Sequence, residues 1–164
     1  MTSDRELVER QLGRPPRAFR AVAVRCPFGR PAVTEQQPFD ENGRPFPTQY
    51  WVTCRHLVAA ISRLEAAGGV ERWSARAREE PELSRSLALA NAEQRALRRE
   101  LAAGRDHPSL ELGVGGASRE GSLKCLHAHA AFALGQPGYR LGNEILAEVE
   151  PLWPADGCCV DARR

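Results

Sequence analysis

The spacing of apolar residues changes its character after Cys54. Before that point, short stretches rich in β-branched and aromatic residues are bounded by proline and glycine, a pattern that predicts strands. These stretches cover residues 19–24, 32–39 and 48–54. They follow a predicted helix at residues 3–12, whose first turn holds a capping box of Ser3 and Glu6.

Beyond Cys54, apolar residues recur at helical spacing. The predicted helices cover residues 57–64, 70–80, 82–103, 122–134 and 141–149. We therefore expect an α+β fold in which a small N-terminal antiparallel sheet of two to three strands packs with four to five helices. One domain is expected over residues 1–152, followed by a C-terminal tail at 153–164.

Composition narrows the class of protein. A chain of 164 residues with 42% hydrophobic and 27% charged residues can bury its own core, which excludes a disordered or fibrous chain. No apolar run approaches the roughly 20 residues that span a bilayer, so no membrane insertion is expected. The charged N-terminal stretch lacks the apolar segment of a signal peptide, and we expect a cytoplasmic protein.

The chain contains five cysteines, an odd number. Without a secretory signal, this count indicates a reducing compartment and free thiols or metal ligands, not a disulfide framework. Cys158 and Cys159 are adjacent and poorly placed to bridge each other, so we expect surface thiols on the tail.

The positive charge of the chain is concentrated near its N-terminus. The net charge of +2 is too small for bulk attraction to nucleic acid or membrane. Residues 10–34, however, contain no acidic residue, and arginine forks bind phosphate and carboxylate. The candidate residues for binding an anionic small molecule or an acidic protein partner are Arg17, Arg20, Arg25, Arg30 and Lys124. The alternative is a solvated basic face.

The densest group of reactive side chains is KCLHAH, residues 124–129. Cys125 and His129 share a face if the segment is helical, and His127 joins them if it is extended. Thiolate and imidazole suit zinc, which takes three or four protein ligands. Further ligands must come from distant segments, and the candidates are Cys54, His56 and Cys26.

Two other interpretations of this group remain open. Cys125 could act as a nucleophile, because Lys124 and the two histidines favour a thiolate, and His127 and His129 could act in catalysis beside it. Alternatively, these residues are half-buried and satisfied by ordinary hydrogen bonds.

Two nearby stretches add weaker signals. The glycine-rich loop at 113–122 resembles a phosphate-binding loop, but Ser122 stands where a lysine belongs. The aromatic stretch at 45–51 could form either a ligand wall or part of the core.

Several motifs taken in order resemble one bacterial family, domain of unknown function 501. The motifs are RQLGRPPR, RCPFGRPAV, DENGRPFPTQYWVTC, SRLEAAGG, GVGG and KCLHAHAAFALG, and the resemblance covers about Gln11 to Leu146. It implies a cytosolic bacterial protein and no established activity.

The resemblance carries over to individual positions. Cys26 matches the family's Arg-Cys-Pro, Cys54 its Thr-Cys, and Glu65 its Ser-Arg-Leu-Glu. Cys125, His127 and His129 match its Lys-Cys-Leu-His-x-His. Phe132 stands where many members have a further histidine, and Arg55 replaces a proline. Neither difference removes a ligand from a metal site made of Cys26, Cys54, Cys125 and one histidine.

Three functions are consistent with these observations. The first is an accessory or regulatory protein with a Cys/His zinc site and a basic segment that binds an anion or a partner. The second is an enzyme, a hydrolase or transferase, that acts on a phosphorylated or anionic small molecule through Cys125 or a bound metal. The third is a helical interaction module that uses an exposed apolar stripe on the helix at 82–103.

Overall fold

The N-terminal third of the chain forms a three-stranded antiparallel sheet in the order β1-β2-β3. In the computed structural model, which describes residues 1–161, the strands are β1 (Phe19–Arg25), β2 (Pro31–Gln36) and β3 (Tyr50–Val52). A tight turn at Cys26–Arg30 closes the β1–β2 hairpin, and the N–H of Gly29 donates to the carbonyl of Cys26. All three predicted strands are present, although the second and third are shorter than expected. β3 forms one edge of the sheet.

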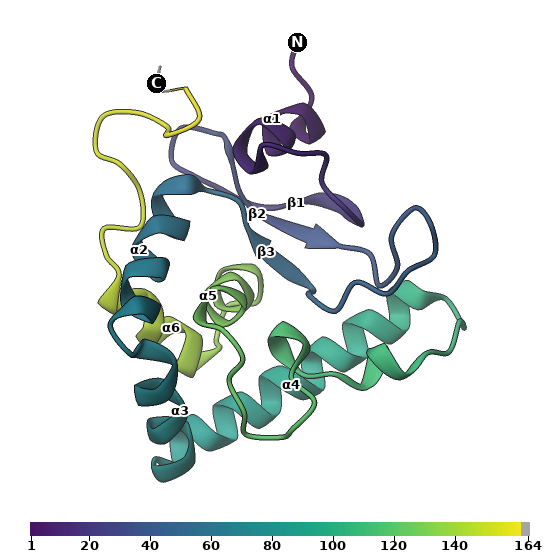
Figure 1. Cartoon of the computed structure of the whole chain (residues 1–164), viewed down its shortest axis with the longest axis vertical. Helices are drawn as coiled ribbons and strands as arrows, with labels where there is room; N and C mark the ends of the chain where they lie inside the picture. The colour runs from purple at the N-terminus through teal and green to yellow at the C-terminus, as the bar shows by residue number, and fades with distance from the viewer. Residues whose placement is uncertain (162–164) are drawn as a thin grey trace.

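Six α-helices in the described residues confirm the α+β class (Figure 1). They are α1 (Asp4–Leu12), α2 (Arg55–Ala66), α3 (Gly69–Glu79), α4 (Pro81–Ala102), α5 (Leu126–Gly135) and α6 (Arg140–Glu148). The capping box of Ser3 and Glu6 begins α1 as predicted. None of the helices in the described part of the chain combines the length and the apolar character needed to cross a bilayer.

Helix α5 lies at the centre of the molecule, between the sheet and the other helices (Figure 1). Its sequence is apolar nearly all round, which is typical of a buried helix. Phe132 packs edge-on between Tyr50 and Tyr139, with ring centroids 5.5 and 5.8 Å away. A Cβ atom at Gly142 would lie 2.6 Å from the carbonyl oxygen of His129, so this glycine lets α6 approach α5 closely.

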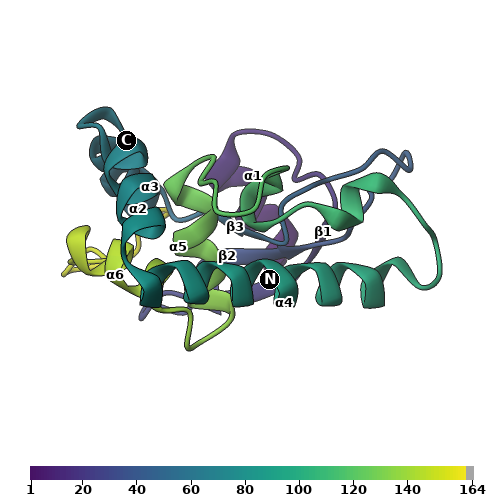
Figure 2. The same ribbon diagram turned by 90° about the horizontal axis from the view of Figure 1, so that it is seen from below.

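Helix α4 runs along one side of the molecule (Figure 2). The stripe predicted on it faces inward: Leu83, Leu87 and Ala90 are buried, and Leu97 and Leu101 are half-buried. The exposed stripe that an interaction module would need is therefore not found on this helix as the structure describes it.

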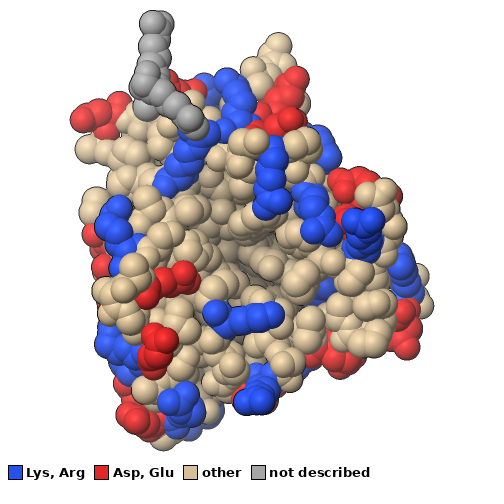
Figure 3. Space-filling model, in the orientation of Figure 1, with Lys and Arg blue, Asp and Glu red and all other residues tan. Residues whose placement is uncertain are grey.

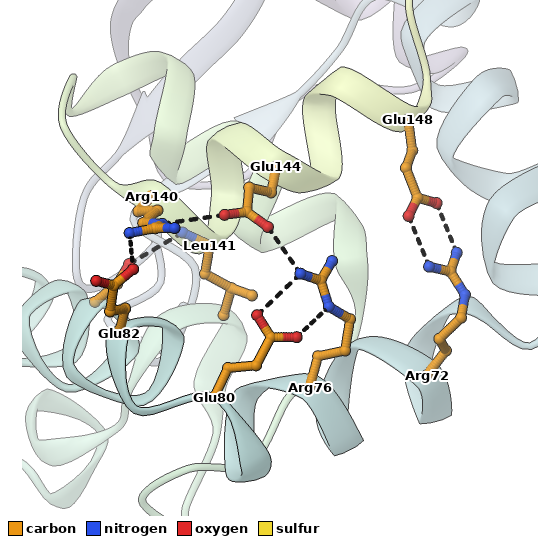
Figure 4. Close-up of polar contacts among 9 residues, drawn as sticks. Arg72, Arg76, Glu80, Glu82, Arg140, Leu141, Glu144 and Glu148 are labelled. Carbon is orange, nitrogen blue, oxygen red and sulfur yellow. Dashed lines mark hydrogen bonds and ion pairs between the residues drawn. The ribbon is translucent and has the colours of Figure 1, made fainter.

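An ion-pair network joins α3, α4 and α6 (Figure 4). Arg72 makes two contacts of 2.6 Å with Glu148, and Arg76 lies 2.6 Å from Glu80 and 3.1 Å from Glu144. Beyond Glu144, Arg140 extends the network to Glu82 at the start of α4. The guanidiniums keep the pKa values of Glu80 and Glu148 below the usual range.

Two expectations for the second half of the chain are wrong. Helix α5 does not begin at Ser122; it begins at Leu126. Two short 3₁₀ turns precede it, one at Pro108–Glu111 and one at Val114–Gly116 within the glycine-rich loop. Cys158 is not a surface thiol, because only 6% of it is exposed. The described part of the tail is anchored to the hairpin, where Asp161 accepts two hydrogen bonds from Arg30 at 2.9 and 3.1 Å.

Candidate functional site

The edge strand β3 directs some of its backbone groups away from the sheet. In the β2–β3 register, Trp51 lies opposite Thr34. On either side of this pair, the carbonyl of Gln49 accepts a backbone hydrogen bond from β2, and the N–H of Thr53 donates to the carbonyl of Ala32. Alternate residues of an antiparallel strand bond to the same neighbour. The N–H and C=O groups of Tyr50 and Val52 therefore point to the free edge of the sheet.

Two adjoining hollows follow this free edge. The smaller, of about 150 Å³, lies between β3 and the start of α5, and its lining includes Phe46, Thr48, Cys125 and His127. The larger, of about 460 Å³, lies between β3, the end of α1 and the start of α2, and its lining includes Gln11, Thr53, Arg55 and Val58. Trp51 and Val52 line both hollows, which together are called the β3 cleft here.

Basic side chains surround the β3 cleft. The guanidinium of Arg14 lies 5.6 Å from the ring centroid of Trp51. Arg55 donates to the carbonyls of Arg10 and Gln11, in the last turn of α1, and Lys124 is an exposed neighbour of Cys125. Within residues 1–161 none of these three cations has a carboxylate at ion-pair distance. Figure 3 shows lysine and arginine side chains around a hollow near the centre of the face that displays β3 and α5.

The arginines predicted to bind anions are paired, including Arg17, which lies 5.6 Å from the ring centroid of Phe46 in the cleft lining. Each has a carboxylate of the same chain within reach: Arg17 with Asp40 at 2.8 Å, Arg20 with Glu35 at 2.6 Å, Arg25 with Asp4 at 2.7 Å, and Arg30 with Asp161 at 2.9 Å. The guanidinium of Arg17 lowers the pKa of Asp40, and that of Arg25 lowers the pKa of Asp4. The positive charge of these four residues is balanced within the chain, whereas Arg14, Arg55 and Lys124 keep theirs at the cleft.

His127 joins α5 to α2. Its Nδ1 lies 3.1 Å from Glu65 Oε1, and its Nε2 lies 3.2 Å from Ser62 Oγ and 3.3 Å from the carbonyl of Val58. The same Glu65 oxygen accepts the N–H of Leu126 at 2.6 Å, so this carboxylate caps α5 from another helix. In the neutral tautomer that donates from Nδ1 to Glu65, Nε2 accepts from the Ser62 hydroxyl and cannot donate to the Val58 carbonyl. This is the order of hydroxyl, base and orienting carboxylate found in nucleophilic catalysis.

Cys125 occupies the N-cap position of α5 and lines the β3 cleft. Burial raises the pKa of its thiol, and the backbone N–H groups of Ala128 and His127 oppose that effect only in part. The 3₁₀ turn at Val114–Gly116 packs closely here, because a Cβ atom at Gly115 would lie 2.9 Å from the Cβ of Ala128. The glycines of this loop thus allow close contact with α5.

His129 is separated from the cleft. Its side chain is fully buried, and its Nδ1 lies 2.7 Å from the hydroxyl of Tyr139. Burial lowers the pKa of His129 to about 4. This histidine is a neutral core residue with one hydrogen-bond partner.

The remaining candidate zinc ligands lie near the C-terminal segment, outside the lining of the β3 cleft and apart from the buried His129. Cys54 contacts Cys159, with 3.7 Å between their sulfur atoms, and Cys26 contacts Cys158. His56 lies beside the carbonyl of Pro151, at 2.9 Å from Nε2. Over residues 1–161, no group of three or more His, Cys, Asp or Glu side chains is arranged to hold a metal ion. The donor atoms of the predicted zinc ligands are dispersed over three places.

Sequence reasoning found Cys125 and His127 but missed their neighbours. Ser62 and Glu65 are three positions apart and therefore lie on one face of a helix. That spacing was visible in the sequence, whereas the contact with His127, 62 residues away from Glu65, was not. Trp51, in the aromatic stretch, is half-buried and lines the cleft.

Comparison with known proteins identifies the family. Residues 22–147 match the family described as protein of unknown function (DUF501), and the chain belongs to it. The match includes β3, α2 and α5, but not Gln11 and Arg14 on the α1 side of the β3 cleft. No curated protein and no solved structure gave a significant match.

Proposed function

We propose that this protein is an accessory protein that binds an extended, acidic segment of a partner protein in the β3 cleft. The observation that supports the proposal is the free edge of β3, which is bordered by two hollows and surrounded by cations without carboxylate partners. A peptide that adds a strand to such an edge gains main-chain hydrogen bonds, and neighbouring pockets select its side chains.

The dimensions of the cleft suit a short segment. The lining of the two hollows runs from Thr48 to Thr53, which at the rise of a strand is about 17 Å. Tyr50 and Val52 are only 5% and 1% exposed, so an added strand would reach their N–H and C=O groups through the two hollows. Trp51, half-buried between the hollows, gives the segment an apolar surface.

The charge of the cleft favours an acidic partner. Arg14, Arg55 and Lys124 lie near it on three different elements or loops, and none is paired with a carboxylate within residues 1–161. Complementary charge speeds association and suppresses wrong partners, and its effect weakens as salt is added.

A peptide titration tests the proposal. The probe is an end-blocked octapeptide of alternating valine and glutamate, and the matched peptide replaces glutamate with lysine. We expect the acidic peptide to bind, to shift the amide resonances of Tyr50 and Val52, and to lose affinity in high salt. The lysine peptide should bind at least tenfold more weakly.

Charge-reversal variants supply the control. Arg14→Glu combined with Lys124→Glu changes two exposed side chains at the cleft, whereas Arg85→Glu changes one exposed side chain on α4. The double variant should weaken binding about tenfold or more, which corresponds to ~1.4 kcal/mol or more, and Arg85→Glu should not. Equal binding of both peptides, or shifts confined to other residues, would refute the proposal.

The arrangement of Ser62, His127 and Glu65 favours a second candidate, a hydrolase or transferase for an anionic small molecule. Cys125 lines the same hollow as His127 and is its alternative nucleophile. Turnover of p-nitrophenyl acetate or p-nitrophenyl phosphate that falls at least 100-fold in His127→Gln, while Arg85→Glu is unaffected, would support an enzyme. Turnover that is unchanged in His127→Gln would count against it.

A further inference from the structure

Four cysteines that are distant in the sequence meet in two pairs. The sulfur atoms of Cys54 and Cys159 lie 3.7 Å apart, although 105 positions separate the residues. Cys158 contacts Cys26 in the turn of the β1–β2 hairpin. All five cysteines of the chain are free thiols in this structure. The two pairs lie side by side, because Cys158 and Cys159 are adjacent.

Other contacts hold the C-terminal segment in this position without any covalent bond. Arg30 donates to both carboxylate oxygens of Asp161, and His56, near the start of α2, lies 2.9 Å from the carbonyl of Pro151. Contacts on both sides of the cysteines therefore bring Cys159 to Cys54. Such placement lowers the entropy that must be lost when a bond closes between distant residues.

The two pairs differ in access from solvent. A hollow of about 660 Å³ opens over the segment, and its lining includes Phe28, Cys158 and Cys159. Cys159 is half-buried, whereas Cys54 is 1% exposed and Cys158 is 6% exposed. Burial raises the pKa of Cys54 to about 11 and that of Cys158 to about 12, which disfavours either as the first thiol to react. Cys159 is thus the accessible member of its pair.

We infer that Cys54 and Cys159 are a site of reversible disulfide formation that fastens the C-terminal segment to the start of α2. The oxidant is a small disulfide of the glutathione class. The Cys159 thiol loses its proton to solvent, and the thiolate attacks one sulfur of the oxidant. This forms a mixed disulfide and releases one thiolate, which takes up a proton.

The second step completes the exchange. The Cys54 thiol loses its proton, and its sulfur attacks the sulfur of Cys159, which forms the Cys54–Cys159 bond and releases the second small thiolate. Two protein thiols are oxidised by two electrons, and one small disulfide is reduced to two thiols. Excess reduced glutathione reverses both steps.

The bond has two expected consequences for the molecule. It closes a loop of more than 100 residues, so the midpoint of thermal unfolding should rise by roughly 5–10 °C. It also fixes Cys54, the N-cap of α2, beside Arg55 at the β3 cleft. The inference itself does not depend on what the cleft binds.

Peptide mapping of the full chain tests the inference. After treatment with glutathione disulfide, we expect a cross-linked peptide pair that contains Cys54 and Cys159 and has lost two hydrogen atoms. Reduction should remove it. Cys159→Ser should lose both the cross-link and the rise in unfolding midpoint, while Cys125→Ser should keep both, because Cys125 lies at the other site.

Three results would overturn the inference. The first is glutathione adducts without an internal cross-link. The second is cross-links that include Cys125 as often as Cys54. The third is about one equivalent of zinc in protein purified under reducing conditions, with thiols that react only after chelation; that result would instead support the zinc interpretation of the sequence. Under reducing conditions Cys159→Ser should unfold at the same midpoint as the unaltered chain, which excludes a general folding defect in this variant.

Discussion

At the scale of single residues, the chemical type of a side chain does not determine its role in this chain. Three members of one short motif have three different environments: Cys125 caps a helix beside a hollow, His127 bridges two helices, and His129 is a buried partner of Tyr139. The four arginines predicted to bind anions are paired with carboxylates between 15 and 131 positions away. Spacing along the chain cannot predict such partners.

The buried His129 makes stability depend on pH. Its pKa is about 4 in the folded chain and 6.5 when exposed, so the unfolded chain binds a proton more readily between these values. The resulting stability is fully present above pH 6.5 and is lost as pH falls towards 4. Between pH 7.5 and pH 5 we expect the free energy of unfolding to fall by about 2 kcal/mol.

Urea denaturation at a series of pH values measures this effect. His129→Asn keeps an acceptor near Tyr139 but cannot titrate, so its free energy of unfolding should change much less between pH 7.5 and pH 5. An NMR titration of the His129 ring in the unaltered chain gives the pKa directly and does not depend on the variant folding. A ring pKa near 6.5 would contradict the prediction.

At the scale of elements, the start of α5 depends on a side chain from another helix. Glu65 accepts the first N–H of α5 and also binds His127. Glu65→Ala should lower the free energy of unfolding by about 1–2 kcal/mol, because a half-buried cap and a side-chain contact are lost together. Denaturant titration checks this result. Glu100→Ala, at an exposed position of α4, should change stability by less than about 0.5 kcal/mol.

The position of the capping residue explains which helix starts the sequence could predict. Helix α1 is capped by its own residues, Ser3 and Glu6, and its start was predicted correctly. The cap of α5 comes from 61 positions away, so Ser122 looked like the better start although the helix begins at Leu126. The candidate site shows the same limit. Cys125 and His127 were identified, but the β3 cleft depends on how β3 sits between α1, α2 and α5.

At the scale of the whole molecule, the net charge of +2 conceals an uneven distribution. Most arginines named here are neutralised in ion pairs, including those that join α3, α4 and α6 in Figure 4. Arg98 is fully buried, its side-chain nitrogens have no partner among residues 1–161, and burial lowers its pKa to about 10. Arg14, Arg55 and Lys124 thus contribute unpaired positive charge at the β3 cleft, as other unpaired arginines do elsewhere in the described part of the chain.

The β1–β2 hairpin contacts both early and late parts of the chain, with Arg25 bound to Asp4 and Arg30 bound to Asp161. A ribosome releases residue 4 before the hairpin but residue 161 long after it. During synthesis the hairpin can therefore acquire its first ionic partner at once, whereas Cys26 can meet Cys158 only after residue 158 has emerged. The order of translation thus allows this cysteine contact to form only after all six described helices have been synthesised.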